Sequence, residues 1–86
     1  MPFLMILIVG MRKTNDIEEL KELGAKVKAL RIKRNSTQLE LAEKCGLDRN
    51  YIGMLERGER NPSYLTLQKI AQGLCVSLTK LLNYKE

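Results

Sequence analysis

The sequence contains no histidine and only two cysteines, which limits the chemistry that its side chains can perform. Cys45 and Cys75 stand far apart in the chain, whereas a metal site needs cysteines or histidines in close clusters. Neither a glycine-rich phosphate loop nor a nucleophile paired with a base is recognisable. We therefore expect no metal and no cofactor, and an enzyme is the weakest hypothesis.

The sequence also lacks any hydrophobic run long enough to cross a membrane. The apolar run at residues 3–9 is far shorter than the roughly 20 residues that a spanning helix needs. It has no preceding basic residue and no small-residue cleavage site, so it is a poor signal peptide. Two interpretations of residues 1–15 stay open: a loose apolar tail and polar link, or a strand or arm used for self-association. We expect a cytoplasmic protein with no membrane partner and no disulfide.

Acidic residues are outnumbered by basic ones, with 15 Lys and Arg against 10 Asp and Glu, for a net charge of +5. A basic balance favours polyanionic partners such as nucleic acid. The segment 26–34 holds several cations and no acid. Its alternative interpretation is a solvated helix end, where cations suit the negative end of the helix dipole.

Apolar residues recur every three or four positions, which is the period of an α-helix. The predicted helix starts carry capping residues: Asp16, Thr37, Asp48, Ser63 and Ser77. Gly46 and Gly58 end two of these helices. Ile17 and Leu65 are expected on inner helix faces. The predicted fold is all-α, a compact five-helix bundle over residues 16–86, which as a small domain would gain buried apolar surface by forming a two-fold homodimer.

The segment Gln38–Gly58 contains two short predicted helices joined by a tight turn at residues 46–48. This is the spacing of a DNA-binding helix-turn-helix. Ala42 is small enough for the two helices to cross closely. Ile52 and Leu55 would hold the second helix against the first. The segment therefore predicts binding to double-stranded DNA.

Residues 23–83 resemble the Cro/C1-type (XRE) helix-turn-helix family. The matching residues are Gly24, Val27, Leu30, Arg31, Gln38, Leu41, Ala42, Gly46, Ile52, Leu55, Glu56, Gly58, Pro62, Leu67, Ile70, Ala71, Leu74, Val76, Ser77 and Leu81. Residues 47–63 look most like the controller proteins of restriction-modification systems. Gly53 and Cys75 depart from that pattern, because many controllers carry Ser at the first position and a small residue such as Gly at the second.

The resemblance implies an operator-binding transcriptional regulator. It suggests a set of DNA-contacting residues: Gln38, Arg49, Asn50, Tyr51, Met54, Arg60 and Asn61. Base reading would come from Arg49, since a guanidinium can bond guanine O6 and N7 together. The alternatives are an exposed first-turn arginine at Arg49, a plain first helical residue at Gln38, a surface ring at Tyr51 and a partly covered surface residue at Met54. Arg31 and Glu56 would form a structural ion pair rather than contact DNA.

A two-fold dimer interface built from the last two predicted helices is expected, with contacts at Leu78, Leu81, Leu82 and Tyr84. The alternative is that this apolar surface packs within one chain. The expected partners are operator DNA, a second copy and RNA polymerase. The second hypothesis for function is an antitoxin or a phage- or plasmid-type repressor that acts with or through a protein partner.

Overall fold

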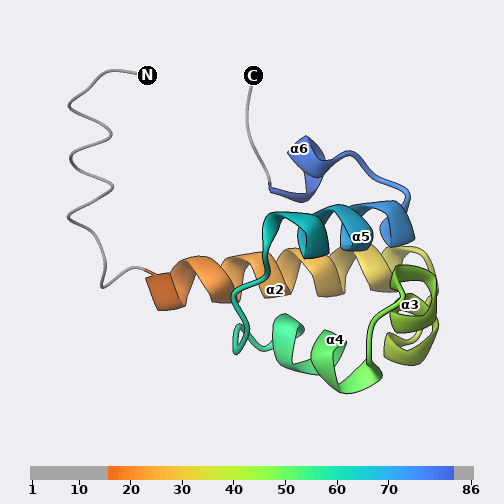
Figure 1. The fold of residues 1–86 in the computed structure, drawn as a ribbon, viewed down its shortest axis with the longest axis horizontal. Coiled ribbons are helices and arrows are strands. Elements are labelled where there is room, and N and C mark those ends of the chain that lie inside the picture. The colour runs from red at the N-terminus through yellow and green to blue at the C-terminus, as the bar shows by residue number, and fades with distance from the viewer. Residues whose placement is uncertain (1–15, 83–86) are drawn as a thin grey trace.

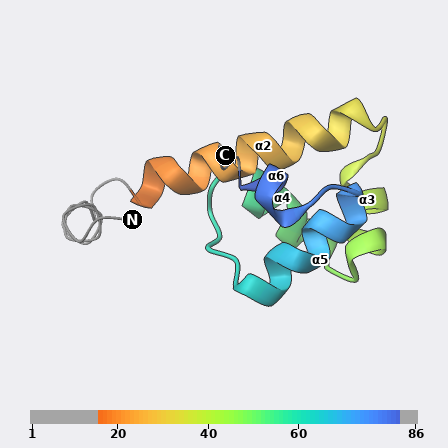
Figure 2. The same ribbon diagram turned by 90° about the horizontal axis from the view of Figure 1, so that it is seen from above.

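The computed structural model describes residues 16–82, which form helices and no strand. The helices are α2 (Asp16–Lys33), α3 (Gln38–Cys45), α4 (Arg49–Glu56), α5 (Tyr64–Leu74) and α6 (Leu78–Leu81). The helix α2 is the longest, and α3 and α4 lie below it in Figure 1 while α6 lies above. Seen from above, α4 and α6 lie between α2 and α5 (Figure 2). Within the described residues, the predicted all-α, five-helix fold is confirmed.

Local capping chemistry sets most of the helix boundaries. Thr37 and Glu40 form the predicted capping box, in which each side chain accepts a hydrogen bond from the other's backbone N–H. Asp48, Ser63 and Ser77 likewise cap the starts of α4, α5 and α6. The prediction for Asp16 was wrong in detail, because this residue is already the first of α2 and so stands inside the first turn.

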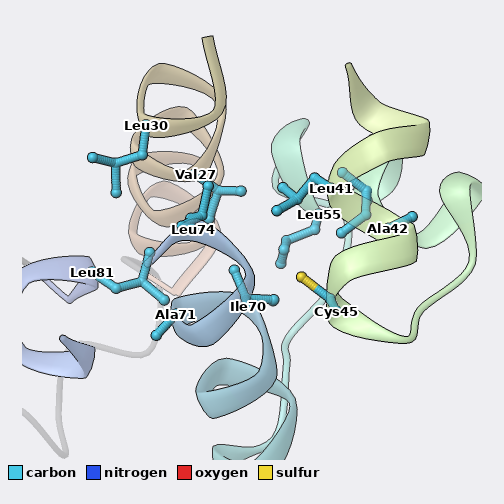
Figure 3. Packing of buried hydrophobic residues seen from close by; sticks show 11 residues of the cluster. Val27, Leu30, Leu41, Ala42, Cys45, Leu55, Ile70, Ala71, Leu74 and Leu81 are labelled. Carbon is cyan, nitrogen blue, oxygen red and sulfur yellow. The ribbon is translucent and has the colours of Figure 1, made fainter. Parts of the chain in front are cut away.

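The core is a single cluster contributed by all five helices. Its buried members are Val27, Leu30, Leu41, Ala42, Cys45, Ile52, Leu55, Ile70, Ala71, Leu74 and Leu81. Most of these side chains converge between α2, α3, α5 and α6 in Figure 3. Cys45 is buried in this cluster, whereas Cys75 is exposed. Burial raises the pKa of the Cys45 thiol, because the thiolate would lose its hydration.

Three predicted placements of apolar residues are corrected by the structure. Ile17 and Leu65 were expected on inner faces but are 64% and 66% exposed, because neither side chain packs in or against the core cluster. Leu81 was expected in a dimer interface but is 1% exposed, since it packs into the core of its own chain. Leu78 and Leu82 are half-buried, and the predicted contact Tyr84 lies outside the described residues, as does the segment 1–15.

The approach of α2 to α4 depends on Gly24, which is buried in the middle of α2. A Cβ at this position would collide with the Leu55 carbonyl oxygen and lie 2.6 Å from that of Glu56. Both neighbours are backbone atoms of α4, so neither can turn away. The missing side chain is therefore what allows the two helices to cross closely.

No helix within residues 16–82 is long and apolar enough to cross a membrane. The same part of the chain contains no cluster of acidic or cysteine side chains that could hold a metal ion.

Candidate nucleic-acid interface

The turn between α3 and α4 has the geometry that the sequence predicted. Gly46 adopts a left-handed conformation with φ of +70°, and the Leu47 N–H donates to the Ala42 carbonyl at 2.8 Å. Asp48 then starts α4 by accepting from the Asn50 N–H at 2.8 Å. These bonds turn the chain within the three residues between α3 and α4. They thereby fix the orientation of α4 relative to α3.

The helix α4 is anchored along one face and free along the other. Ile52 and Leu55 are fully buried in the core, whereas Arg49 and Asn50 in the first turn are exposed. Met54 is half-buried. The leading end of α4 is thus available to a partner, which the predicted reading role of Arg49 and Asn50 requires.

Two predicted contact residues from different segments lie together. The Arg60 guanidinium lies over the Tyr51 ring, 5.4 Å from its centroid, in a cation–π arrangement. Tyr51 is half-buried and also packs against the core, while Arg60 and Asn61 are exposed in the loop that follows α4. The contact holds this loop beside α4 rather than letting it project away.

A buried carboxylate ties together the first three described helices. Glu56, whose side chain is 3% exposed, accepts from Arg31 Nε at 2.7 Å and from Arg31 Nη2 at 3.1 Å. It also accepts from Gln38 Nε2 at 3.0 Å. The hydrogen bond from Arg31 to Glu56 raises the pKa of that guanidinium. The expected structural ion pair is confirmed, and it also orients Gln38 at the start of α3.

Sequence reasoning missed one cation at this surface, Arg57. A Cβ at Gly53 would lie 3.4 Å from Arg57 Nη1 and 3.6 Å from Gln38 Oε1, so both side chains lie over the same point of α4. Gly53 is buried beneath them. No local pattern signals this position, since even a Cβ at Gly53 would lie at ordinary contact distance from both side chains.

Arg57 forms an exposed, two-point ion pair with Glu59. Its Nε and Nη2 atoms donate to the two carboxylate oxygens at 3.0 and 3.2 Å. This contact lowers the pKa of Glu59 and raises that of Arg57. Glu59 is the one acid in the short segment 57–61, which otherwise carries Arg57, Arg60 and Asn61.

Comparison with known proteins places this geometry in a family. The helix-turn-helix family HTH_3 matches residues 27–81. Control protein C.BamHI from Bacillus amyloliquefaciens is 42% identical over 72 residues, 83% of this chain and 86% of that protein. Control protein C.SmaI from Serratia marcescens is 45% identical over 67 residues, 78% of this chain and 77% of its own length. The immunity repressor of Bacillus phage phi105 is 39% identical over 59 residues, which are 69% of this chain but only 41% of the repressor.

Solved structures give the same result. The restriction-modification controller C.AhdI from Aeromonas hydrophila superimposes with a TM-score of 0.70 at 36% identity, covering 74% of this chain and 96% of that one. A tetramer of the controller C.Esp1396I in complex with its 35-base-pair operator matches with a TM-score of 0.67 at 34% identity, covering 77% of this chain and 96% of that one. The chain therefore belongs to the Cro/C1-type (XRE) helix-turn-helix family and is a relative of the restriction-modification controller proteins.

Proposed function

We propose that this protein is a sequence-specific DNA-binding transcriptional regulator that controls a restriction-modification operon. The observation that carries the proposal is the orientation of α4, with a buried rear face and exposed Arg49 and Asn50 at its leading end. A helix held in this way can enter the major groove with its N-terminal residues toward the base edges. The controller relatives and the operator complex of one of them support the same interpretation.

The predicted contacts divide by chemistry into base readers and phosphate binders. Arg49 and Asn50 face outward from the first turn and are proposed to read bases. Gln38, oriented by Glu56, is proposed to bind a phosphate at the start of α3. Arg60 is stacked on Tyr51. Arg60 and the adjacent Asn61 are proposed to bind the DNA phosphate backbone, at the edge of the major groove where the C-terminal end of α4 would emerge. Met54 is proposed to make an apolar contact one turn after Asn50.

We also propose a two-fold dimer as the DNA-binding form. A groove between α2 and α6 is lined by Leu20, Leu23 and Leu82, with acidic residues of α2 at its edge. Half-buried Leu82 in this groove, together with half-buried Leu78 on the same short helix, offers apolar surface that a second copy would cover. Tyr84 remains a proposed contributor from outside the described residues. A two-fold dimer predicts an operator with two inverted half-sites whose centres lie about 34 Å apart.

The regulator is proposed to act in the cytoplasm by occupying a promoter, where it would recruit or exclude RNA polymerase. No catalytic step is needed for this activity, because occupancy alone changes transcription. Whether the protein activates or represses would follow from the position of the operator relative to the promoter.

The experiment that tests this function is a gel-shift titration with the DNA directly upstream of the chain's own coding region. A scrambled duplex of equal length and composition serves as the control. Specific binding predicts an affinity for the upstream duplex at least about 1,000-fold higher than for the scrambled one. Equal affinity for both duplexes would contradict the proposal.

A further inference from the structure

The Arg57–Glu59 pair lies among the proposed phosphate contacts, and its position is the starting point of an inference that rests on the proposed DNA-binding function. Arg57 Nη1 and Gln38 Oε1 both lie within ordinary contact distance of the point where a Gly53 side chain would begin. Gln38 is the proposed phosphate binder of α3. A DNA strand that reaches Gln38 therefore passes the Arg57 guanidinium as well.

The pair contributes little to the fold itself. Its side chains are 59% and 50% exposed, and ion pairs at such positions are largely screened by solvent. The backbone of this turn is already fixed by other bonds, since the Gly58 N–H donates to Leu55 and the Glu59 N–H donates to Met54. The Arg57–Glu59 ion pair therefore adds little to the stability of the fold. Its main effect is on the charge that this surface presents to a partner.

Glu59 occupies two of the donors that a phosphate would use. The Arg57 Nε and Nη2 atoms form one edge of the guanidinium, and this edge is the one that binds the Glu59 carboxylate. Arginine binds phosphate through the same two-point geometry. A DNA phosphate at Arg57 must therefore either displace Glu59 or share the guanidinium with it through Nη1.

We propose that Arg57 is a further phosphate-binding residue of this interface and that Glu59 competes with DNA for it. The competition lowers the affinity for every duplex by a similar factor, because phosphates carry no sequence information. It limits the non-specific DNA binding of a protein whose net charge is +5. Discrimination between DNA sequences is then left to Arg49 and Asn50. Gly53 lies beneath both side chains, where even a Cβ would make only ordinary contacts with them.

The test compares three variants, Arg57→Gln, Glu59→Gln and the double variant, on the upstream duplex and on the scrambled duplex across a salt titration. Arg57→Gln should weaken binding to both duplexes by roughly tenfold, and the slope of log affinity against log salt should become shallower by about 0.9 for each phosphate that Arg57 neutralises. Glu59→Gln should tighten binding to both duplexes by a common factor. In the double variant the gain from Glu59→Gln should disappear, because the residue for which Glu59 competes is absent.

Glu18→Gln, which removes an equal charge at the exposed start of α2, is the matched control and should leave both affinities close to those of the wild type. An unchanged salt dependence in Arg57→Gln would overturn the phosphate-binding role of Arg57. If Glu59→Gln tightens binding equally with and without Arg57, Glu59 merely repels DNA and the competition is disproved. Either result leaves the proposed function standing as long as the wild type prefers the upstream duplex, whereas absence of that preference in the wild type is a failure of the function itself.

Discussion

At the scale of single residues, the proposed base reader Arg49 differs from Arg31 and Arg57 because no carboxylate forms an ion pair with it in the described residues. Arg49 is exposed in the first turn of α4 and belongs to none of the ion pairs found in the described residues, whereas Arg31 and Arg57 are each held by a carboxylate. An unrestrained guanidinium at the leading end of a recognition helix can turn to meet a guanine edge. Arg31 cannot do so without giving up the buried carboxylate of Glu56.

The substitution Arg49→Ala should therefore reduce sequence preference sharply while leaving the fold intact. A two-point arginine–guanine contact discriminates by about 1–3 kcal/mol, so the preference for the upstream duplex should fall by roughly tenfold or more per half-site. Gel-shift titration measures the preference, and far-ultraviolet circular dichroism checks the helical content. Lys28→Ala, an exposed cation on α2, is the control. If Arg49→Ala prefers the upstream duplex as strongly as the wild type does, Arg49 does not read the sequence.

The two thiols differ in environment and should differ in reactivity. Cys45 is 5% exposed and its pKa is raised by burial, so at neutral pH it stays protonated and covered. Cys75 is exposed at the end of α5. An aromatic disulfide reagent at pH 8 should label Cys75 rapidly and Cys45 on the order of 100-fold more slowly, since Cys45 reacts only when the structure opens. Equal rates in Cys45→Ala and Cys75→Ala variants would contradict the described burial.

At the scale of elements, two glycines in mid-helix have opposite roles. Gly24→Ala places a methyl group against the backbone of α4, which cannot move aside, and should cost about 2 kcal/mol of unfolding free energy despite the better helix propensity of alanine. Gly53→Ala meets only the ends of the Gln38 and Arg57 side chains and should gain up to about 1 kcal/mol. Urea unfolding of both variants measures the difference. Similar changes in the two would show that α2 and α4 do not cross as described.

The same scale shows what the sequence could predict. Caps at Thr37, Asp48, Ser63 and Ser77 were identified because each is a local signal, complete within four residues. The exposure of Ile17 and Leu65 could not be predicted in this way. Helix periodicity identifies an apolar stripe, but whether the stripe is covered depends on where the neighbouring helices end.

The candidate site likewise contains residues that local sequence predicts and contacts that depend on tertiary packing. Gln38, Arg49 and Asn50 follow from their places in the helix-turn-helix pattern. The contact of Arg60 with Tyr51 arises only when the loop folds back onto α4, and the place of Arg57 beside Gln38 arises only when α3 packs against α4. No local pattern encodes either arrangement. Leu81 illustrates the opposite error, since a short apolar helix supplies both core and surface and its sequence does not assign residues between them.

At the scale of the whole molecule, dimerisation and DNA binding are expected to be coupled. One copy presents a single α4 of eight residues, which reads only a short stretch of DNA. A two-fold pair presents two such helices, and each copy then adds to the affinity of the other. In Figure 1, α6 and α4 lie on opposite sides of α2, so a partner at the α2–α6 groove leaves both copies of α4 accessible. Asn61, which also lines this groove, is the proposed DNA contact that would lie next to the partner.

This coupling predicts the result of Leu82→Gln, which removes apolar surface from the α2–α6 groove without changing charge. Burial of a leucine contributes about 2 kcal/mol, so the dissociation constant of the dimer should rise roughly tenfold or more, and the gel-shift titration should move to higher protein concentration with it. Ile32→Gln removes a comparable apolar side chain that is 54% exposed elsewhere on α2 and should change neither quantity. Analytical ultracentrifugation at several protein concentrations measures the dimer dissociation constant of the wild type and of both variants. A Leu82→Gln dimer as tight as the wild type would place the interface on another face of the molecule.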